Sequence, residues 1–322
     1  MEYYDKALIS KDTIKVEDIL SNGPYRDNIT IKTVVLLIGA LALASASVDL
    51  SKVKRIEELD EFWEQLDPSL QKLRGTNAAP DSRVVNGKEA KPGQFPYQAL
   101  VVTFFENGSG GLCGGSLLTQ NFVMTAAHCV VSGSPPSHGT ITLGAINRQV
   151  EEETQQRIAH GTINVHPNYT ASSLRNDIAT IQLSTPAVFN DFVQPIDLPA
   201  ISDTRRFSGF MGIVSGFGRT TNYPPASDVL MYSSNPILTN ANCQSSWIQE
   251  QNICLSGHGG RSVCFGDSGG PLAVRENNRT IQVGITSFVH WSGCDTGHAA
   301  GFARVSYFLS WIAENSDVVL RD

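Results

Sequence analysis

The feature that most constrains the fold of this chain is a succession of short β-branched and aromatic runs. From Val84 onward such runs include residues 100–105, 178–183 and 281–288, and clusters of Gly, Asn, Pro and Ser separate them. The chain contains 28 Gly and 15 Pro, which favours many short strands over long helices. We therefore expect an antiparallel all-β body of the sandwich or barrel type. One helix is expected near the end, where four apolar residues share a face: Val305, Phe308, Leu309 and Ile312.

Charge and cysteine content exclude several classes of protein. The chain has 24 basic and 31 acidic residues, a formal net charge of −7, so we expect no nucleic-acid partner and no anionic lipid surface. Its 6 cysteines are too few for a miniprotein scaffold built on disulfides. An even number suits an oxidising compartment, and the sequence alone leaves about 15 pairings open.

The N-terminal part contains one long apolar run, residues 34–44. It is too short for a bilayer, which takes about 20 residues, and so resembles the apolar centre of a secretory signal. Lys32 precedes it, and Ala44-Ser45-Ala46 has the small-x-small form of a cleavage site. We expect residues 1–46 to contain the signal, with cleavage after Ala46 and secretion. Residues 1–31 are unlike an ordinary signal start, and two interpretations stay open: a start placed too far upstream, or an uncleaved membrane anchor.

Residues 47–83 are expected to form a propeptide. Apolar residues recur there at helical spacing among acidic ones, which predicts a short amphipathic helix that covers an apolar surface. They are Ile56, Leu59, Phe62, Trp63 and Leu66. The pattern ends in a loop-forming stretch at 75–81, which a protease could enter, and Arg83-Val84 follows.

Three short motifs carry candidate catalytic side chains. His128 lies in Thr-Ala-Ala-His-Cys, Asp177 opens an apolar strand, and Ser268 lies in Gly-Asp-Ser-Gly-Gly-Pro. Taken singly, His128 and Asp177 are better explained as a core histidine and a strand-start aspartate, and Ser268 equally well as a turn serine. Together they supply what a nucleophilic serine needs: a base for its proton and an anion that holds the base.

These motifs, with Arg83-Val-Val-Asn-Gly, resemble the trypsin/chymotrypsin family of serine endopeptidases. The resemblance covers Val84 to about Asn315 and implies two packed six-stranded antiparallel β-barrels, roughly 84–200 and 201–305, with a C-terminal helix at about 305–315. It also implies a hydrolase that needs no metal and no cofactor, acts on protein or peptide substrates, and is a monomer.

The resemblance implies a role for each site residue. Ser268 would attack the scissile carbonyl, His128 would accept its proton, and Asp177 would orient the imidazole. The N–H groups of Gly266 and Ser268 would form the oxyanion hole, and Ser287 would pair with the substrate backbone.

The resemblance also implies maturation and cross-linking. A trypsin-like protease would cleave after Arg83, and the new ammonium group of Val84 would pair with Asp267 inside the protein. The uncut chain should then lack a formed oxyanion hole. Because no cysteine precedes residue 113, the propeptide should leave. The family's disulfides would be Cys113–Cys129, Cys243–Cys254 and Cys264–Cys294.

We expect the enzyme to prefer substrates with an uncharged side chain at the residue before the cut bond (P1). Ser262, not a carboxylate, stands at the pocket base, and desolvating an arginine or lysine head there without an anion is costly. Val289 and Ala300 are expected on the pocket walls, where the valine would narrow the pocket as in elastase-like members. The wider pattern is similar to arthropod digestive chymotrypsin-, elastase- and collagenase-like enzymes.

Several alternatives are weighed against this interpretation. A catalytically silent homologue would typically lack a triad member, whereas this chain keeps all three. A cascade protease often carries a cysteine-rich domain upstream, and residues 1–83 have no cysteine, which favours digestion or general proteolysis. We interpret the acidic run 151–153 as a solvated loop and not a calcium site. Protein inhibitors are possible partners, and three tripeptides have the form of glycan acceptors, at Asn107, Asn168 and Asn278.

Overall fold

The computed structural model describes most of the chain from Leu50 onward. The described residues are Leu50, 53–71, 87–221, 226–243, Ser245, 247–290 and 292–322. All of them belong to one compact unit, Asp49–Asp322. The expected signal segment and the Arg83–Val84 bond lie outside the described residues. Within the described part, no helix is both long enough and apolar enough to cross a membrane.

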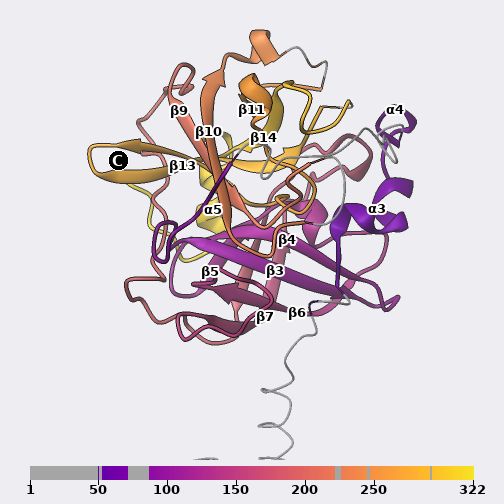
Figure 1. Cartoon of the computed structure of the whole chain (residues 1–322), viewed down its shortest axis with the longest axis vertical. Coiled ribbons are helices and arrows are strands. Elements are labelled where there is room, and N and C mark those ends of the chain that lie inside the picture. Colours follow the sequence, from indigo (N-terminus) through magenta and orange to yellow (C-terminus); the bar gives the residue numbers. More distant parts are fainter. Residues whose placement is uncertain are drawn as a thin grey trace, which may run out of the picture. The chain divides into compact units, whose positions relative to one another are not determined.

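The first half of the body is a six-stranded antiparallel sheet that closes on itself as a barrel (Figure 1). Its strand order is β4-β3-β6-β7-β8-β5, and β5 returns to pair with β4. The strands are β3 (Gln98–Phe105), β4 (Gly110–Leu117), β5 (Phe122–Thr125), β6 (Pro136–Leu143), β7 (Gln156–Val165) and β8 (Ala179–Leu183). A further short strand, β1 (Lys54–Arg55), joins β4 in parallel register, with Lys54 opposite Gly111.

The second half is a barrel of the same kind. Its strand order is β11-β14-β13-β12-β9-β10, and β10 closes the sheet by pairing with β11. The strands are β9 (Met211–Gly216), β10 (Met231–Leu238), β11 (Asn252–Leu255), β12 (Pro271–Glu276), β13 (Arg279–Phe288) and β14 (Ala300–Arg304). The two-residue strand β2 (Lys88–Glu89) adds to β10. The two six-stranded barrels confirm the expected fold class.

Each barrel has its own buried apolar cluster, because inward-facing side chains alternate along closed sheets. The second cluster is built from strand residues such as Val214, Ile253, Leu272 and Phe302. The first cluster combines barrel residues with side chains of the expected propeptide, Ile56 among them.

Helical structure is sparse and short. The C-terminal helix is expected at about 305–315; the chain there forms a 3-10 turn, η7 (Val305–Tyr307), followed by α5 (Leu309–Glu314). Other 3-10 turns in the body are η3 (Ala127–Cys129), η4 (Ala171–Ser173), η5 (Asn240–Cys243) and η6 (His258–Gly260).

The expected amphipathic helix of the propeptide is present but divided. It consists of η1 (Ile56–Glu58), α3 (Asp60–Glu64) and the one-turn α4 (Pro68–Gln71). The division falls at Leu59, whose backbone is extended (φ −83°, ψ 134°). All five apolar residues of the predicted face are buried, and they pack against the first barrel: Ile56, Leu59, Phe62, Trp63 and Leu66.

Three disulfides join the pairs that the family resemblance implies: Cys113–Cys129, Cys243–Cys254 and Cys264–Cys294.

Candidate active site

The pairing of β5 with β8 brings His128 and Asp177 together. Thr125, the last residue of β5, lies opposite Ala179, the first residue of β8. His128, three positions after β5, therefore lies near Asp177, two positions before β8. His128 Nδ1 lies 2.8 Å from Asp177 Oδ2, and the His128 backbone N–H donates to Asp177 Oδ1 at 3.0 Å. Both side chains are buried. Two contacts to one carboxylate fix the ring orientation and place the Nδ1 proton toward Asp177.

A third donor completes the surroundings of Asp177. The Ser287 hydroxyl, at the end of β13, donates to Asp177 Oδ2 at 2.5 Å. The sequence assigns Ser287 only to substrate pairing and misses this contact, because it joins residues 110 positions apart in two different barrels. A buried anion is costly unless its oxygens are hydrogen-bonded, and here all three donors serve that purpose.

The electrostatic surroundings favour a protonated His128. Burial alone would lower the pKa of His128, but the charge and hydrogen bond of Asp177 and the charge of Glu57 outweigh it and raise the pKa. An imidazole that gains a proton readily, next to a buried anion, has the property of a general base.

Ser268 sits on a tight turn that both barrels hold in place. The Gly114 N–H of β4 donates to the Ser268 carbonyl at 2.8 Å, and the Gly269 N–H donates to the Thr286 carbonyl of β13 at 2.8 Å. Gly269 has φ +79°, and a Cβ there would lie 2.1 Å from Thr125 Oγ1, so this position requires glycine. These contacts therefore fix the turn that carries Ser268 beside the loop that carries His128.

The serine hydroxyl does not bind the histidine in this chain. Ser268 Oγ donates to the carboxylate of Glu57, a residue of the expected propeptide. His128 Nε2 is buried and has no hydrogen-bond partner among the described residues. Of the three predicted catalytic residues, the structure joins His128 to Asp177 and diverts Ser268 to a fourth residue. Sequence reasoning missed Glu57 because it is one of several acids between the apolar positions and no motif surrounds it.

Gly266, the predicted oxyanion donor, also contacts Glu57. Its N–H donates to the carboxylate oxygens Oε2 and Oε1 at 3.2 and 3.4 Å. The Gly266 N–H thus faces a carboxylate in the uncut chain, while the expectation that this chain lacks a formed oxyanion hole stays a prediction. The physical reason for this orientation is that an anion is already present to attract the N–H.

Asp267, the residue before Ser268, is buried under the turn. Its carboxylate accepts N–H bonds from Gly218 at 2.8 Å and Cys264 at 2.9 Å. Burial raises the pKa of Asp267 to about 7, and these two hydrogen bonds oppose the rise only in part. Its expected partner, the new N-terminus at Val84, lies outside the described residues.

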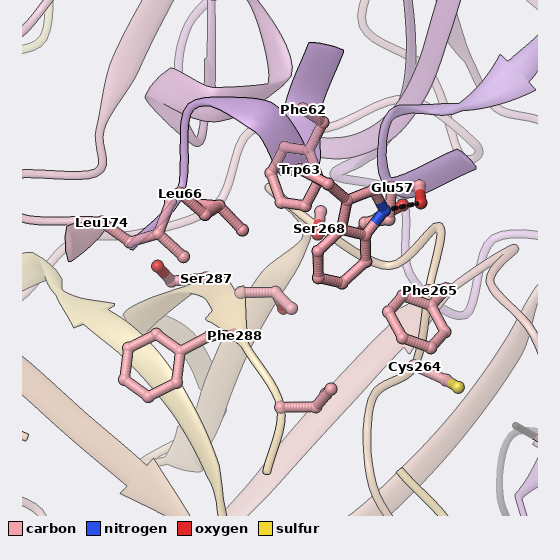
Figure 2. Close-up of a pocket in the computed structure, with 12 residues that line it drawn as sticks. Glu57, Phe62, Trp63, Leu66, Leu174, Cys264, Phe265, Ser268, Ser287 and Phe288 are labelled. Atoms are coloured by element: carbon pink, nitrogen blue, oxygen red, sulfur yellow. Dashed lines mark hydrogen bonds between the residues drawn. The ribbon is translucent and has the colours of Figure 1, made fainter. Parts of the chain in front are cut away.

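The cavity beside Ser268 contains two of the four residues predicted for substrate binding. Ser287 and Val289 line it, together with Phe265 and Phe288. Ser262 and Ala300 are buried but are not among the lining residues. Figure 2 shows that side chains of the expected propeptide enter the same space from the opposite side; they are Glu57, Phe62, Trp63 and Leu66.

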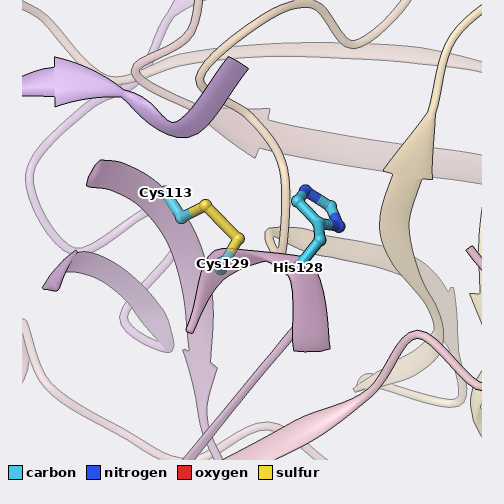
Figure 3. Close-up of side chains that lie close together, drawn as sticks. All are labelled: Cys113, His128 and Cys129. Carbon is cyan, nitrogen blue, oxygen red and sulfur yellow. A yellow bond between two sulfur atoms is a disulfide. The ribbon is translucent and has the colours of Figure 1, made fainter. Parts of the chain in front are cut away.

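Two groups of possible metal ligands have other roles. Cys113, His128 and Cys129 lie close together (Figure 3), but the two sulfur atoms form a disulfide and so offer no thiolate to a metal. In the acidic run, Glu152 is half-buried and accepts the Ile146 N–H at 2.7 Å. Its carboxylate therefore holds a loop, which the sequence interpretation as a solvated run does not foresee.

The three glycan-acceptor asparagines are all exposed.

Comparisons with known proteins agree with this geometry. The family description that matches is Trypsin, over residues 84–312. Serine protease 1 of Drosophila melanogaster is 36% identical over 239 residues, covering 73% of this chain and 86% of that protein. Brachyurin of Leptuca pugilator is 35% identical, covering 73% of this chain and 99% of that protein. A solved structure of HL collagenase matches with a TM-score of 0.66 and 31% identity, covering 73% of this chain and 100% of the other. With its barrels, its buried histidine–aspartate pair and these relatives, the chain belongs to the trypsin family and is a serine endopeptidase.

Proposed function

We propose that the chain is the precursor of a secreted endopeptidase and that Ser268 is the nucleophile of the cleaved form. The observation that carries this assignment is the buried 2.8 Å contact between His128 and Asp177, located beside the glycine-bounded turn of Ser268. An alcohol, an imidazole and an anion at adjoining positions are the elements of an acyl-enzyme mechanism.

The chemistry assigns one task to each group. His128 accepts the Ser268 proton as the hydroxyl attacks the peptide carbonyl, and later returns it to the leaving amine. Asp177 stabilises the imidazolium through Nδ1. The Gly266 and Ser268 N–H groups stabilise the oxyanion, and loss of one such donor typically raises the barrier by about 2.7–4 kcal/mol. Water then hydrolyses the acyl-enzyme.

Activation by cleavage after Arg83 gives Asp267 an ammonium group as partner. A carboxylate whose pKa is raised to about 7 by burial gains stability when an ammonium group binds beside it. The family match begins at residue 84, where the new N-terminus would be. A trypsin-like protease is the proposed activator because the residue before the bond is arginine.

We assign an uncharged P1 preference, elastase- or chymotrypsin-like. The described lining of the cavity is predominantly apolar, with Phe265, Phe288 and Val289, and it includes no carboxylate from the protease body. The remaining lining carboxylate, Glu57, belongs to the propeptide. A panel of peptides that differ only at P1 tests the preference: Ala, Val or Leu should be cut fastest and aromatic residues next. Fastest turnover after Arg or Lys would overturn it.

The biological setting follows from the same features. We assign secretion from the apolar signal-like run and digestive or general proteolysis from the absence of cysteine in residues 1–83. Proteins or peptides are the substrates, the mature enzyme is a monomer, and protein inhibitors are potential partners.

A serine-directed covalent probe tests the assignment of Ser268. Precursor and Ser268→Ala precursor are cut after Arg83, and the propeptide is removed by gel filtration. The wild-type enzyme should react with the probe and cut peptides, whereas the variant should do neither. A cleaved wild-type enzyme without labelling and activity would instead support a catalytically silent homologue.

A further inference from the structure

Residues 53–71, here called the blocking segment, lie across the catalytic residues of the body. The segment enters through the parallel pairing of β1 with β4 and continues through η1 and α3 (Figure 1). Its apolar side chains belong to the same buried cluster as those of the first barrel. It is therefore packed into the body at the catalytic centre, and the contacts it makes there decide what it does.

The Glu57 carboxylate takes the two groups that a substrate carbonyl would need. It accepts the Ser268 hydroxyl and the Gly266 N–H. A hydroxyl that donates to Glu57 does not donate to His128, and His128 Nε2 is left without a partner among the described residues. An ionised carboxylate also resists nucleophilic attack, so the contact is stable toward the chemistry of the site.

The blocking segment presents no peptide bond to the serine. The carbonyl oxygen of Glu57 accepts a hydrogen bond from Trp63 Nε1 at 2.7 Å, drawn as the dashed line in Figure 2. The backbone around it is helical, in η1 and α3, and not the extended form that pairs with a strand edge. The segment therefore occupies the site without offering a bond to cut.

Apolar side chains of the blocking segment fill the space where substrate side chains would bind. Phe62, Trp63 and Leu66 are all buried and line the cavity next to Phe288. The Phe62 ring lies 5.5 Å from the His128 ring, and the Trp63 ring lies 6.4 Å from Phe265. About 40 Å³ remains between these groups, enough for a few water molecules. A peptide cannot enter while the segment is in place.

Polar contacts fix the orientation of the blocking segment. Glu58 bonds Arg219 of the body at 2.7 Å and Arg55 of the segment at 2.5 Å. Farther along the chain, the Asp67 N–H donates to the Ser172 carbonyl at 2.8 Å. These bonds place the neighbouring Glu57 at the oxyanion hole.

We propose that the blocking segment is an intramolecular inhibitor that remains bound after cleavage at Arg83 and competes with substrate, with the Glu57 carboxylate in the place of the oxyanion. This inference rests on the proposed function. Because no cysteine precedes residue 113, only non-covalent contacts hold the segment once the chain is cut. Its effective concentration is high in the uncut chain and falls to its bulk concentration after cleavage. Full activity therefore requires two events, cleavage and dissociation of the segment.

The test uses three full-length precursors: wild type, Glu57→Gln and Glu64→Gln. Glu64 is exposed on α3, so its change removes the same charge from the same segment without altering the catalytic centre. Each precursor is cut after Arg83, the activating protease is removed, and hydrolysis of an uncharged-P1 peptide is followed without separating the segment. Wild type and Glu64→Gln should gain specific activity on dilution, with a raised apparent KM and an unchanged kcat. Glu57→Gln should show inhibition about 10-fold to 100-fold weaker, as expected for loss of a hydrogen bond to a charged group.

A second measurement separates failure of this inference from failure of the proposed function. Mature enzyme freed of the segment by gel filtration must cut the peptide; if it does not, the proposed function is wrong. If it does, and the unseparated wild-type mixture is equally active at every concentration, the segment is not an inhibitor. Equal inhibition by Glu57→Gln and Glu64→Gln would contradict the role of Glu57. Should the Glu57→Gln precursor not fold, peptides spanning 53–71, with and without this change, are added to wild-type mature enzyme, with the same expected difference.

Discussion

Three buried carboxylates lie around Ser268, and each is held by its own set of hydrogen-bond partners. Asp177 has an imidazole, an N–H and a hydroxyl, Glu57 has a hydroxyl and an N–H, and Asp267 has two N–H groups. Burial is tolerated for an anion when charge or hydrogen bonds compensate for lost water. Burial raises the pKa of Asp267 to about 7, so its two N–H donors compensate for the lost water only in part in the uncut chain.

The raised pKa of Asp267 predicts a pH-dependent stability of the uncut chain. Between its ordinary value of 3.8 and about 7, the folded chain binds a proton that the unfolded chain has released. Stability should therefore fall as the pH rises through this range, by up to about 1.4 kcal/mol per pH unit. The comparison is between uncut wild type and uncut Asp267→Asn in urea unfolding at several pH values. The variant should lack this component of the slope.

The chain cleaved after Arg83 is the control for this prediction. After the ammonium of Val84 pairs with Asp267, the pKa of the carboxyl should fall, and the loss of stability toward neutral pH should disappear. Identical pH slopes for uncut wild type, uncut Asp267→Asn and cleaved wild type would show that Asp267 does not titrate in this window.

At the scale of elements, the blocking segment depends on one ionic contact at its entry to the site. Burial alone would raise the pKa of Glu58, but the hydrogen bond from Arg219 and the charge of Arg55 outweigh it and lower the pKa below 4.5. A lowered carboxyl pKa contributes stability above the ordinary value and loses it as the pH falls through the lowered one. Ionised Glu58 therefore stabilises the binding of the segment at neutral pH. This contribution is lost in acid, when the carboxylate gains a proton.

We expect acid to release the blocking segment from the cleaved protein. Gel filtration in the cold should show segment and body together at about pH 7 and increasingly separate as the pH falls through the lowered pKa of Glu58. Glu58→Gln should bind more weakly at about pH 7 and lose less on acidification. The result that contradicts this is equal retention of wild type and Glu58→Gln at neutral pH.

Elements with a local pattern are the ones that sequence predicts. The strands 98–105, 179–183 and 279–288 follow the β-branched runs, and the apolar face of 56–66 is buried as its spacing indicates. The sequence does not reveal which distant residue an isolated polar side chain will contact. Glu57 and Ser268 are 211 positions apart, and nothing near Glu57 distinguishes it from the other acids of the segment. The break at Leu59 likewise follows from docking on the barrel, because the local composition favours one continuous helix.

At the scale of the whole molecule, the proposed catalytic residues come from both barrels. His128 and Asp177 follow and precede strands of the first barrel, and Ser268 and Ser287 belong to the second. The site is assembled only if the two barrels keep their relative position. Helix α5 contributes to this, since it follows the last strand of the second barrel and buries Leu309 and Ile312 in the cluster of the first.

Helix α5 should therefore stabilise the molecule as a unit. Ile312 is fully buried, and its truncation to alanine should lower the free energy of unfolding by about 2–5 kcal/mol through lost burial and a cavity. Ser310 is exposed on the same helix, so Ser310→Ala is the matched control and should change stability by less than about 0.5 kcal/mol. Because the site spans both barrels, activity should be lost at the denaturant concentration where intrinsic fluorescence reports unfolding, and both midpoints should move together in Ile312→Ala. The contrary outcome is loss of activity by the variant at a lower denaturant concentration than that of the fluorescence change. In that case helix α5 would fix the relative position of the barrels without stabilising either one. The account of α5 as part of the first barrel's core would then be wrong.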